Sequence, residues 1–131
     1  PTSNLGKIGL AISPQNPDVL YAAIELDRRK GAVYRSIDRG STWHKQSNTV
    51  SRATGPHYYQ ELYTSPHKFD RLYLMNVRIL TSEDGGKTFV QLKERDKHSD
   101  NHSINFRCVN RITNSIHQRP ICTRCYQNEI E

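Results

Sequence analysis

Residues 36–43 read SIDRGSTW and residues 82–89 read SEDGGKTF, so the chain contains one eight-residue pattern twice. Serine, aspartate, glycine and threonine occupy alternate positions in both stretches, and an aromatic residue ends each of them. A short carboxylate at the end of a strand accepts hydrogen bonds from nearby backbone N–H groups, and glycine adopts turn angles that other residues resist. The pattern therefore predicts a turn between two strands, with an aspartate that is structural rather than catalytic.

Each turn is expected to use the same five positions. The hydroxyl groups are expected to bond across the hairpin, and the aromatic residue is expected to enter the fourth strand as an apolar plug between sheets. The predicted structural residues are Ser36, Asp38, Gly40, Thr42 and Trp43 in the first turn and Ser82, Asp84, Gly86, Thr88 and Phe89 in the second.

The similarity between the two copies extends upstream of the turns. The segment DVLYAA at 18–23 matches DRLYLM at 70–75, an offset of 52 residues, whereas the turn aspartates are 46 residues apart. The loop LDRRKG at 26–31 accounts for the difference, since surface loops tolerate insertions. In the first copy, apolar, β-branched and aromatic residues between turn-rich segments predict strands at 8–12, 19–24, 32–37 and 42–46.

Four strands in a repeat of this length are typical of a β-propeller blade. The predicted fold class is all-β: a partial β-propeller of two four-stranded blades plus the start of a third. The expected division is a blade at 1–50, a blade at 51–97, and the start of a third blade with a non-matching tail at 98–131. Propellers close with about 4–8 blades, so the expected partners are the remaining blades or further copies of the chain.

The two turns resemble Asp-box repeats, also called BNR repeats, of sialidases, xyloglucanase-type glycoside hydrolases and sortilin or Vps10-type receptors. The resemblance covers roughly residues 5–102 and includes GKIGLAISPQNPDVLYAAIE at 6–25 and YYQELYTSPHKFDRLYLMNV at 58–77. These segments are similar to large secreted bacterial propellers. The resemblance implies that the boxes lie on the outer rim, away from the ligand face, and that the protein is extracellular or periplasmic.

The sequence does not contain a recognisable catalytic set of the resembling enzymes. Sialidases use arginines, a tyrosine nucleophile and an acid, which Arg52, Tyr58, Tyr59 and Glu61 could imitate. We favour the alternative that the tyrosines begin an inner strand, because aromatic residues in strands usually pack. Xyloglucanase-type hydrolysis needs two carboxyl groups, and the candidates outside the boxes are Glu25, Asp27, Glu61, Glu94 and Asp100.

Residues 97–103 read KHSDNHS, in which His98, Asp100 and His102 alternate. On an extended strand these side chains point the same way, and imidazole and carboxylate groups both bind Zn²⁺. The favoured alternative is a polar strand that faces the propeller channel, because a further metal ligand is not evident. We therefore predict no metal or cofactor. The predicted ligand-binding residues are His98, Asp100, His102, Tyr58, Tyr59 and Arg52.

The repeat pattern stops after Ile104. One interpretation of the tail is a zinc site built from Cys108, His117, Cys122 and Cys125, which include the pair CTRC. The spacing from Cys108 to His117 is unusual for such a site, and the abrupt change in composition favours a tail foreign to the propeller.

The charge pattern does not favour a nucleic-acid partner, and the hydropathy does not favour a membrane span. The net charge is +6, but the densest basic cluster is DRRK at 27–30, without a nucleic-acid-binding motif. No apolar run reaches about 18 residues, so no membrane span is predicted. The chain begins at Pro1 without a visible signal peptide, which indicates a processed product or a fragment.

The leading functional hypothesis is a module that binds a protein, peptide or polysaccharide on the channel face, without catalysis by this chain. One alternative is part of a xyloglucanase-like or sialidase-like glycoside hydrolase whose catalytic carboxylates lie mostly elsewhere. Another is a structural fragment without activity. A pair of carboxylates that face each other in the channel at the spacing of a glycosidase, about 6.5–9.5 Å for inversion, and that includes Glu61 or Asp100 would favour the hydrolase.

Overall fold

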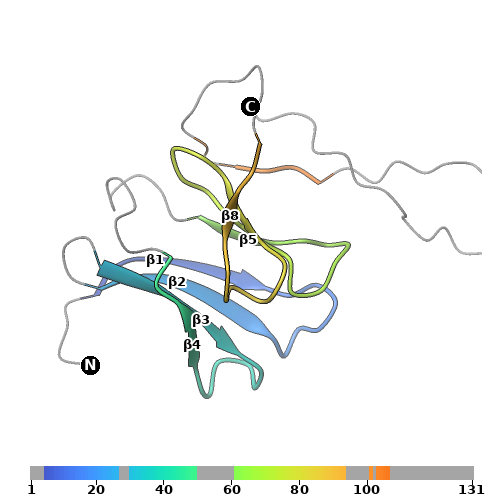
Figure 1. Cartoon of the computed structure of the whole chain (residues 1–131). Coiled ribbons are helices and arrows are strands. Elements are labelled where there is room, and N and C mark those ends of the chain that lie inside the picture. The colour runs from blue at the N-terminus through green and yellow to red at the C-terminus, as the bar shows by residue number, and fades with distance from the viewer. Residues whose placement is uncertain (1–4, 27–29, 50–60, 94–100, 102, 107–131) are drawn as a thin grey trace, which may run out of the picture.

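A computed structural model of the chain describes residues 5–26, 30–49, 61–93, 101 and 103–106. These residues form two four-stranded antiparallel sheets, in which each strand pairs with the next along the chain (Figure 1). The first sheet contains β1 (Leu5–Ile12), β2 (Leu20–Leu26), β3 (Lys30–Ser36) and β4 (His44–Ser47), and the second contains β5 (Leu62–Thr64), β6 (Leu72–Leu74), β7 (Leu80–Ser82) and β8 (Val90–Gln91). The prediction of an all-β chain with four strands per repeat is confirmed.

The alternation of side chains along β2 and β3 decides what faces the second sheet. Tyr21 pairs with Arg35 and Ala23 with Val33 in the β2–β3 register, so these four residues share one face. Tyr21, Ala23 and Val33 are fully buried there. The core between the sheets consists of Val19, Tyr21, Ala23, Val33, Leu62, Leu72 and Leu74, with Ala11, Leu80 and Phe89 packed against it.

The sheets pack through their side chains, but strand backbones of the two sheets come close to each other along one edge only. Among the described residues, β5 lies beside β1 and β2 of the first sheet. The backbone of β4 does not come close to a strand of the second sheet, nor that of β8 to a strand of the first. The sheets therefore diverge from the β1–β5 edge, as blades diverge from the axis of a propeller. We refer to this side as the inner edge.

Trp43 corrects one expectation about the turns. Phe89 does pack into the core between the two sheets, but the equivalent Trp43 lies just before β4 and is 38% exposed. Its indole Nε1 donates a hydrogen bond to the Gly40 carbonyl at 2.9 Å. Trp43 is exposed because the second sheet covers the other face of the first sheet, the face that carries Tyr21 and Val33.

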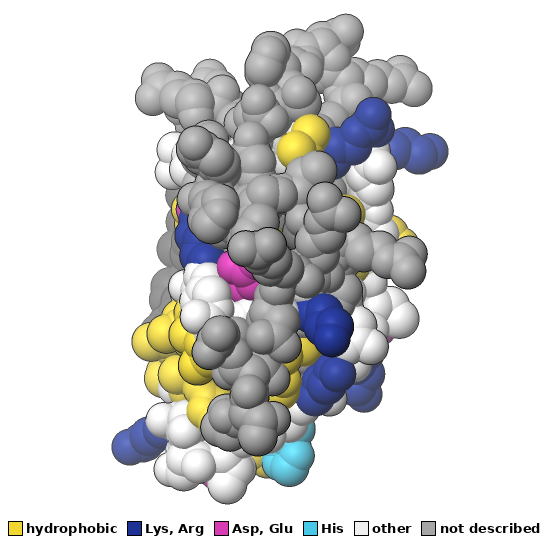
Figure 2. All heavy atoms as spheres, turned by 90° about the vertical axis from the view of Figure 1, so that its left-hand side faces the viewer, with side chains coloured by type: hydrophobic (Ala, Val, Ile, Leu, Met, Phe, Trp, Pro, Cys, Tyr) yellow, Lys and Arg dark blue, Asp and Glu magenta, His cyan; other side chains and the backbone are white. Residues whose placement is uncertain are grey.

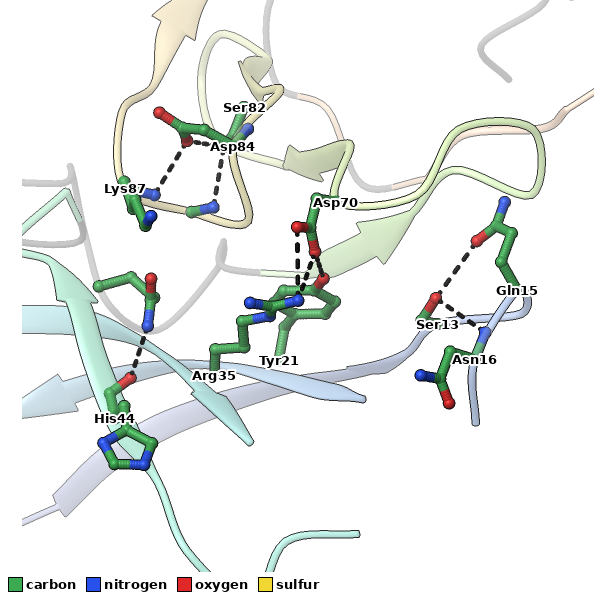
Figure 3. Close-up of polar contacts among 12 residues, drawn as sticks. Ser13, Gln15, Asn16, Tyr21, Arg35, His44, Asp70, Ser82, Asp84 and Lys87 are labelled. Atoms are coloured by element: carbon green, nitrogen blue, oxygen red, sulfur yellow. Dashed lines mark hydrogen bonds and ion pairs between the residues drawn. The ribbon is translucent and has the colours of Figure 1, made fainter. Parts of the chain in front are cut away.

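A polar link joins the sheets outside the apolar core (Figure 3). Asp70, in the turn before β6, accepts a hydrogen bond from the Tyr21 hydroxyl. Its carboxylate also forms an ion pair with the Arg35 guanidinium at 3.0 Å. The Arg35 guanidinium also lies over the Phe69 ring, 5.7 Å from its centroid. Burial, followed by the bond to Asp70, raises the pKa of Tyr21 well above its ordinary value, so this hydroxyl stays a donor.

The opposite face of the second sheet has its own smaller core. Tyr73, Met75 and Ile79 pack there with Ile104, and Phe106 lies against the Tyr73 ring. Buried Asn101 bonds to the carbonyl of Asn76, two residues after β6.

The described residues include no helix that could cross a membrane.

Candidate functional site

The two Asp-box turns are closed hydrogen-bonded units. Asp84 accepts bonds from the Ser82 hydroxyl at 2.8 Å and from the Lys87 backbone N–H at 3.0 Å (Figure 3). It also accepts bonds from the Thr88 backbone N–H at 2.9 Å and from the Thr88 hydroxyl at 2.6 Å. Burial is the largest single influence on Asp84 and raises its pKa, but the bonds from Thr88, Ser82 and Lys87 together outweigh it and lower the pKa to about 2.

Asp38 has the equivalent serine and threonine partners in the first turn. Its carboxylate accepts bonds from the Thr42 hydroxyl at 2.6 Å, the Thr42 N–H at 2.9 Å and the Ser36 hydroxyl at 2.7 Å. The bonds from Thr42, and then that from Ser36, lower its pKa to about 2. Both oxygens of both aspartates therefore accept hydrogen bonds that hold the turn.

A different cluster lies at the other end of the sheets, on the inner edge. Lys7 of β1 donates its backbone N–H to Glu25 Oε2 at 3.2 Å and its ammonium group to Glu61 Oε1 at 2.7 Å. Glu25 lies in β2, and Glu61 immediately precedes β5. Lys7 thus joins one carboxylate from each sheet. We call Lys7, Glu25 and Glu61 the inner-edge cluster.

A β-bulge positions Glu25 against Lys7. The register passes from Leu5 opposite Leu26 to Ile8 opposite Ile24, so Gly6 and Lys7 together oppose Glu25. A side chain at position 6 would overlap the carboxylate, because a Cβ there would lie 2.1 Å from Glu25 Oε2. A larger residue there would require the flexible Glu25 side chain to shift, and the bulge turns the Lys7 N–H toward the carboxylate.

The inner-edge cluster retains unused bonding capacity. The second carboxylate oxygen of Glu61, Oε2, is buried and has no hydrogen-bond partner among the described residues. Burying a charged oxygen without a partner is costly, so such an atom usually marks a position that another group can occupy. Carboxylate acceptors beside an ammonium donor can bind the hydroxyl groups of a sugar.

The inner-edge cluster lies at the end of the sheets opposite the two Asp boxes. The strand β1 begins and β2 ends at the cluster, whereas both boxes follow the far ends of β3 and β7. Figure 2 views the molecule from the cluster's end and shows an acidic side chain beside Lys or Arg side chains.

Only part of the predicted site falls within the described residues. The structure brings together two predicted carboxylates, Glu25 and Glu61. Asp27, Glu94, Arg52, Tyr58, Tyr59, His98, Asp100 and His102 lie outside the described residues, as do Cys108, His117, Cys122 and Cys125. Within the described part of the chain, no three His, Cys, Asp or Glu side chains are placed to hold a metal ion.

Sequence reasoning missed Lys7 as a member of the site. Its role depends on the contact between β1 and β5, which no local pattern reports. The signal that could have found the bulge is Gly6, because a glycine inside an apolar strand often marks a bulge.

The comparisons with known proteins identify the fold. No family model and no curated protein matches the sequence. A GH74 enzyme from Niastella koreensis and a GH74 xyloglucanase from Xanthomonas campestris match 63% of the chain, each with 24% sequence identity and with TM-scores of 0.50 and 0.51. The chain covers 13% of the length of each enzyme. The two sheets therefore have the fold of part of a β-propeller of the kind found in GH74 enzymes.

Proposed function

We propose that the chain supplies two adjacent blades to a propeller that binds a polysaccharide of the xyloglucan type through the inner-edge cluster. The observation that carries the proposal is the meeting of Glu25 and Glu61 at Lys7, at the end of the sheets opposite the Asp boxes. The two GH74 structures support a glycan as the ligand, since one of them is a xyloglucanase.

Glycoside hydrolysis in a complete propeller is the second candidate function. Hydrolysis needs two carboxyl groups on either side of the glycosidic bond, and a carboxylate pair that includes Glu61 was the feature expected to favour it. The inner-edge cluster contains two carboxylates, Glu25 and Glu61, that both bond to Lys7, and Glu61 is one of the two residues named for that pair. Capture of a protein or peptide gains no support from the two solved structures, so it becomes an outcome of the test.

Affinity electrophoresis of the full 131-residue chain tests the proposal. The net charge of +6 carries the chain toward the cathode in a native gel, and dissolved xyloglucan is expected to retard it. The variants Glu25→Gln and Glu61→Gln keep the side-chain shape but remove the charge, and we expect each to lose most of the retardation.

Glu83→Gln is the matched control. Glu83 also pairs with basic residues, Lys68 and Arg71, but it lies in the second Asp box at the opposite end. This variant is expected to be retarded like the unmodified chain. A folded chain that xyloglucan does not retard, or that instead binds immobilised peptides, would contradict the proposal, and so would equal losses in all three variants.

A further inference from the structure

Two basic residues lie opposite each other at the end of the second sheet that is remote from the Asp boxes. The β7–β8 ladder continues beyond the strands, because the Leu92 N–H donates a hydrogen bond to the Ile79 carbonyl at 2.9 Å. In the register of these strands, Arg78 and Lys93 are the next pair after Ile79 and Leu92. Both basic side chains are exposed. This end of the sheet therefore carries two adjacent positive charges.

The repeat does not require charges at these two positions. The residues 46 positions earlier, at the equivalent places of the first copy, are Ala32 and Ser47. Like charges directly opposite each other on neighbouring strands destabilise a sheet. Among the described residues, no carboxylate forms an ion pair with Arg78 or Lys93. The two cations are therefore available to an anionic group of a ligand, which would offset their repulsion.

The turn that carries Arg78 is held by a buried amide group. Asn101 is fully buried, and its Nδ2 donates hydrogen bonds to the carbonyls of Asn76 at 3.2 Å and Val77 at 3.1 Å. The Val77 N–H donates to the side-chain oxygen of Asn76 at 2.8 Å. Arg78 thus follows a fixed connection between β6 and β7, which reduces the ordering that the turn needs on binding a ligand.

The basic pair and the inner-edge cluster lie at the same end of the second sheet. Met75 donates its N–H to the Glu61 carbonyl at 2.9 Å, and the β6–β7 register places Met75 opposite Ile79. Glu61 therefore begins a row of residues that crosses the sheet and ends beside the basic pair. Neighbouring strands are about 4.8 Å apart, so the backbones of β7 and β8 lie roughly 10 and 14 Å from that of β5. An extended ligand such as a polysaccharide chain can reach both places.

We propose that Arg78 and Lys93 bind carboxylate groups of an acidic polysaccharide whose neutral sugars contact the inner-edge cluster. This ligand class rests on the proposed function, which supplies the polysaccharide, and narrows it to a glycan that carries carboxylated sugars. A guanidinium group binds a carboxylate through two parallel N–H bonds, and the ammonium group adds a further donor and charge. Glu25 and Glu61 repel an acidic group at the cluster itself, so the acidic and neutral parts of the ligand lie over different strands. Figure 2 shows that Lys and Arg side chains predominate over acidic ones at this end.

Two probes that differ in charge test the anion subsite. One is a fluorescently labelled xyloglucan oligosaccharide, and the other is the same oligosaccharide after oxidation of its primary hydroxyl groups to carboxylates. Fluorescence anisotropy with the full 131-residue chain measures the dissociation constant of each probe. We expect the carboxylated probe to bind about tenfold more tightly at low salt, because a charged hydrogen bond contributes roughly that factor. Added salt is expected to reduce the difference.

Single-charge variants locate the subsite. Arg78→Gln and Lys93→Gln are each expected to abolish the preference for the carboxylated probe, while the neutral probe binds as before. Lys87→Gln is the matched control, because Lys87 is an exposed cation in the second Asp box at the opposite end, and this variant is expected to keep the preference. Without a ligand, Arg78→Gln and Lys93→Gln are expected to raise the melting temperature slightly at low salt, since they relieve the repulsion. A lower melting temperature would contradict the opposition of two uncompensated charges.

The binding results separate this proposal from the proposed function. Equal affinity for the two probes would overturn the anion subsite and leave the proposed function intact. A preference that survives in both Arg78→Gln and Lys93→Gln, or that Lys87→Gln abolishes equally, would also overturn the subsite, since general charge attraction would explain it. Binding of neither probe would contradict the proposed function and the subsite together. Binding of the carboxylated probe alone, lost in Arg78→Gln and Lys93→Gln, would support the subsite but contradict xyloglucan as the ligand.

Discussion

Asp38 and Asp84 illustrate how a carboxylate can hold a turn by accepting several hydrogen bonds. Each accepts bonds from the hydroxyl and the N–H of the threonine four residues after it, and from the hydroxyl of the serine two residues before it. These donors close the turn between the third and fourth strands. The repeated residue types are therefore explained by a hydrogen-bond pattern, and the glycines by positive φ.

The lowered pKa values of these aspartates predict an acid limit for the fold. Each pKa is about 2 in the folded chain, compared with an ordinary value of 3.8. The stabilisation is therefore complete above about pH 4 and is lost as the pH falls toward 2. Melting temperatures measured by circular dichroism across this range should fall with pH.

The variant Asp84→Asn checks that assignment. It should lower the melting temperature at neutral pH and flatten the fall between pH 4 and 2, because one of the two titrating groups is gone. A pH dependence that is unchanged in Asp84→Asn would contradict the role given to this carboxylate.

At the scale of elements, Gly86 and Gly40 separate backbone strain from packing. Both have positive φ, so alanine at either position strains the backbone by a similar amount. Only Gly86→Ala also forces a methyl group against Val33 of the other sheet. We expect Gly86→Ala to lower the free energy of unfolding by about 1–3 kcal/mol more than Gly40→Ala. Urea unfolding of the two variants measures the difference, and equal losses would contradict the packing of the second box on the first sheet.

The hydrogen bond from Tyr21 to Asp70 predicts a second difference between variants. Tyr21→Phe leaves the ring in the core but removes the donor, and we expect a loss of about 1–2 kcal/mol in the free energy of unfolding. Tyr34→Phe is the control, because Tyr34 lies on the opposite face of β3 from Arg35. Unfolding by urea compares the two, and a loss no greater for Tyr21→Phe than for Tyr34→Phe would speak against the link between the sheets.

Sequence patterns predict these elements well where the information is local. The four strands of the first copy and the turns of both boxes follow from apolar runs, turn residues and glycines. The outward position of Trp43, the link through Asp70 and the contact of Lys7 with Glu61 do not follow. Each of these features depends on which face of one sheet packs against the other, and residues far apart in the sequence decide that packing.

At the scale of the whole molecule, repetition explains why the two sheets differ. Leu10 and Leu62 occupy the same position of the two repeats, but Leu62 is buried and Leu10 is exposed. Burial at this position comes from the neighbouring blade and not from the repeat itself. Stability in such an array depends on the interfaces between units as well as on each unit. The inner-edge cluster also depends on an interface, since it takes Lys7 and Glu25 from one sheet and Glu61 from the segment leading into the other.

The central claim is therefore that the two sheets pack face to face as adjacent blades. The most direct test is a nuclear Overhauser measurement on the isotopically labelled chain between the Gly86 Hα protons and the Val33 methyl groups. The packing of Val33 Cγ1 against Gly86 predicts a strong cross-peak between residues of different sheets. If contacts within each sheet, such as that between Leu72 and Ser82, are present but this cross-peak is absent, the two sheets do not pack as adjacent blades.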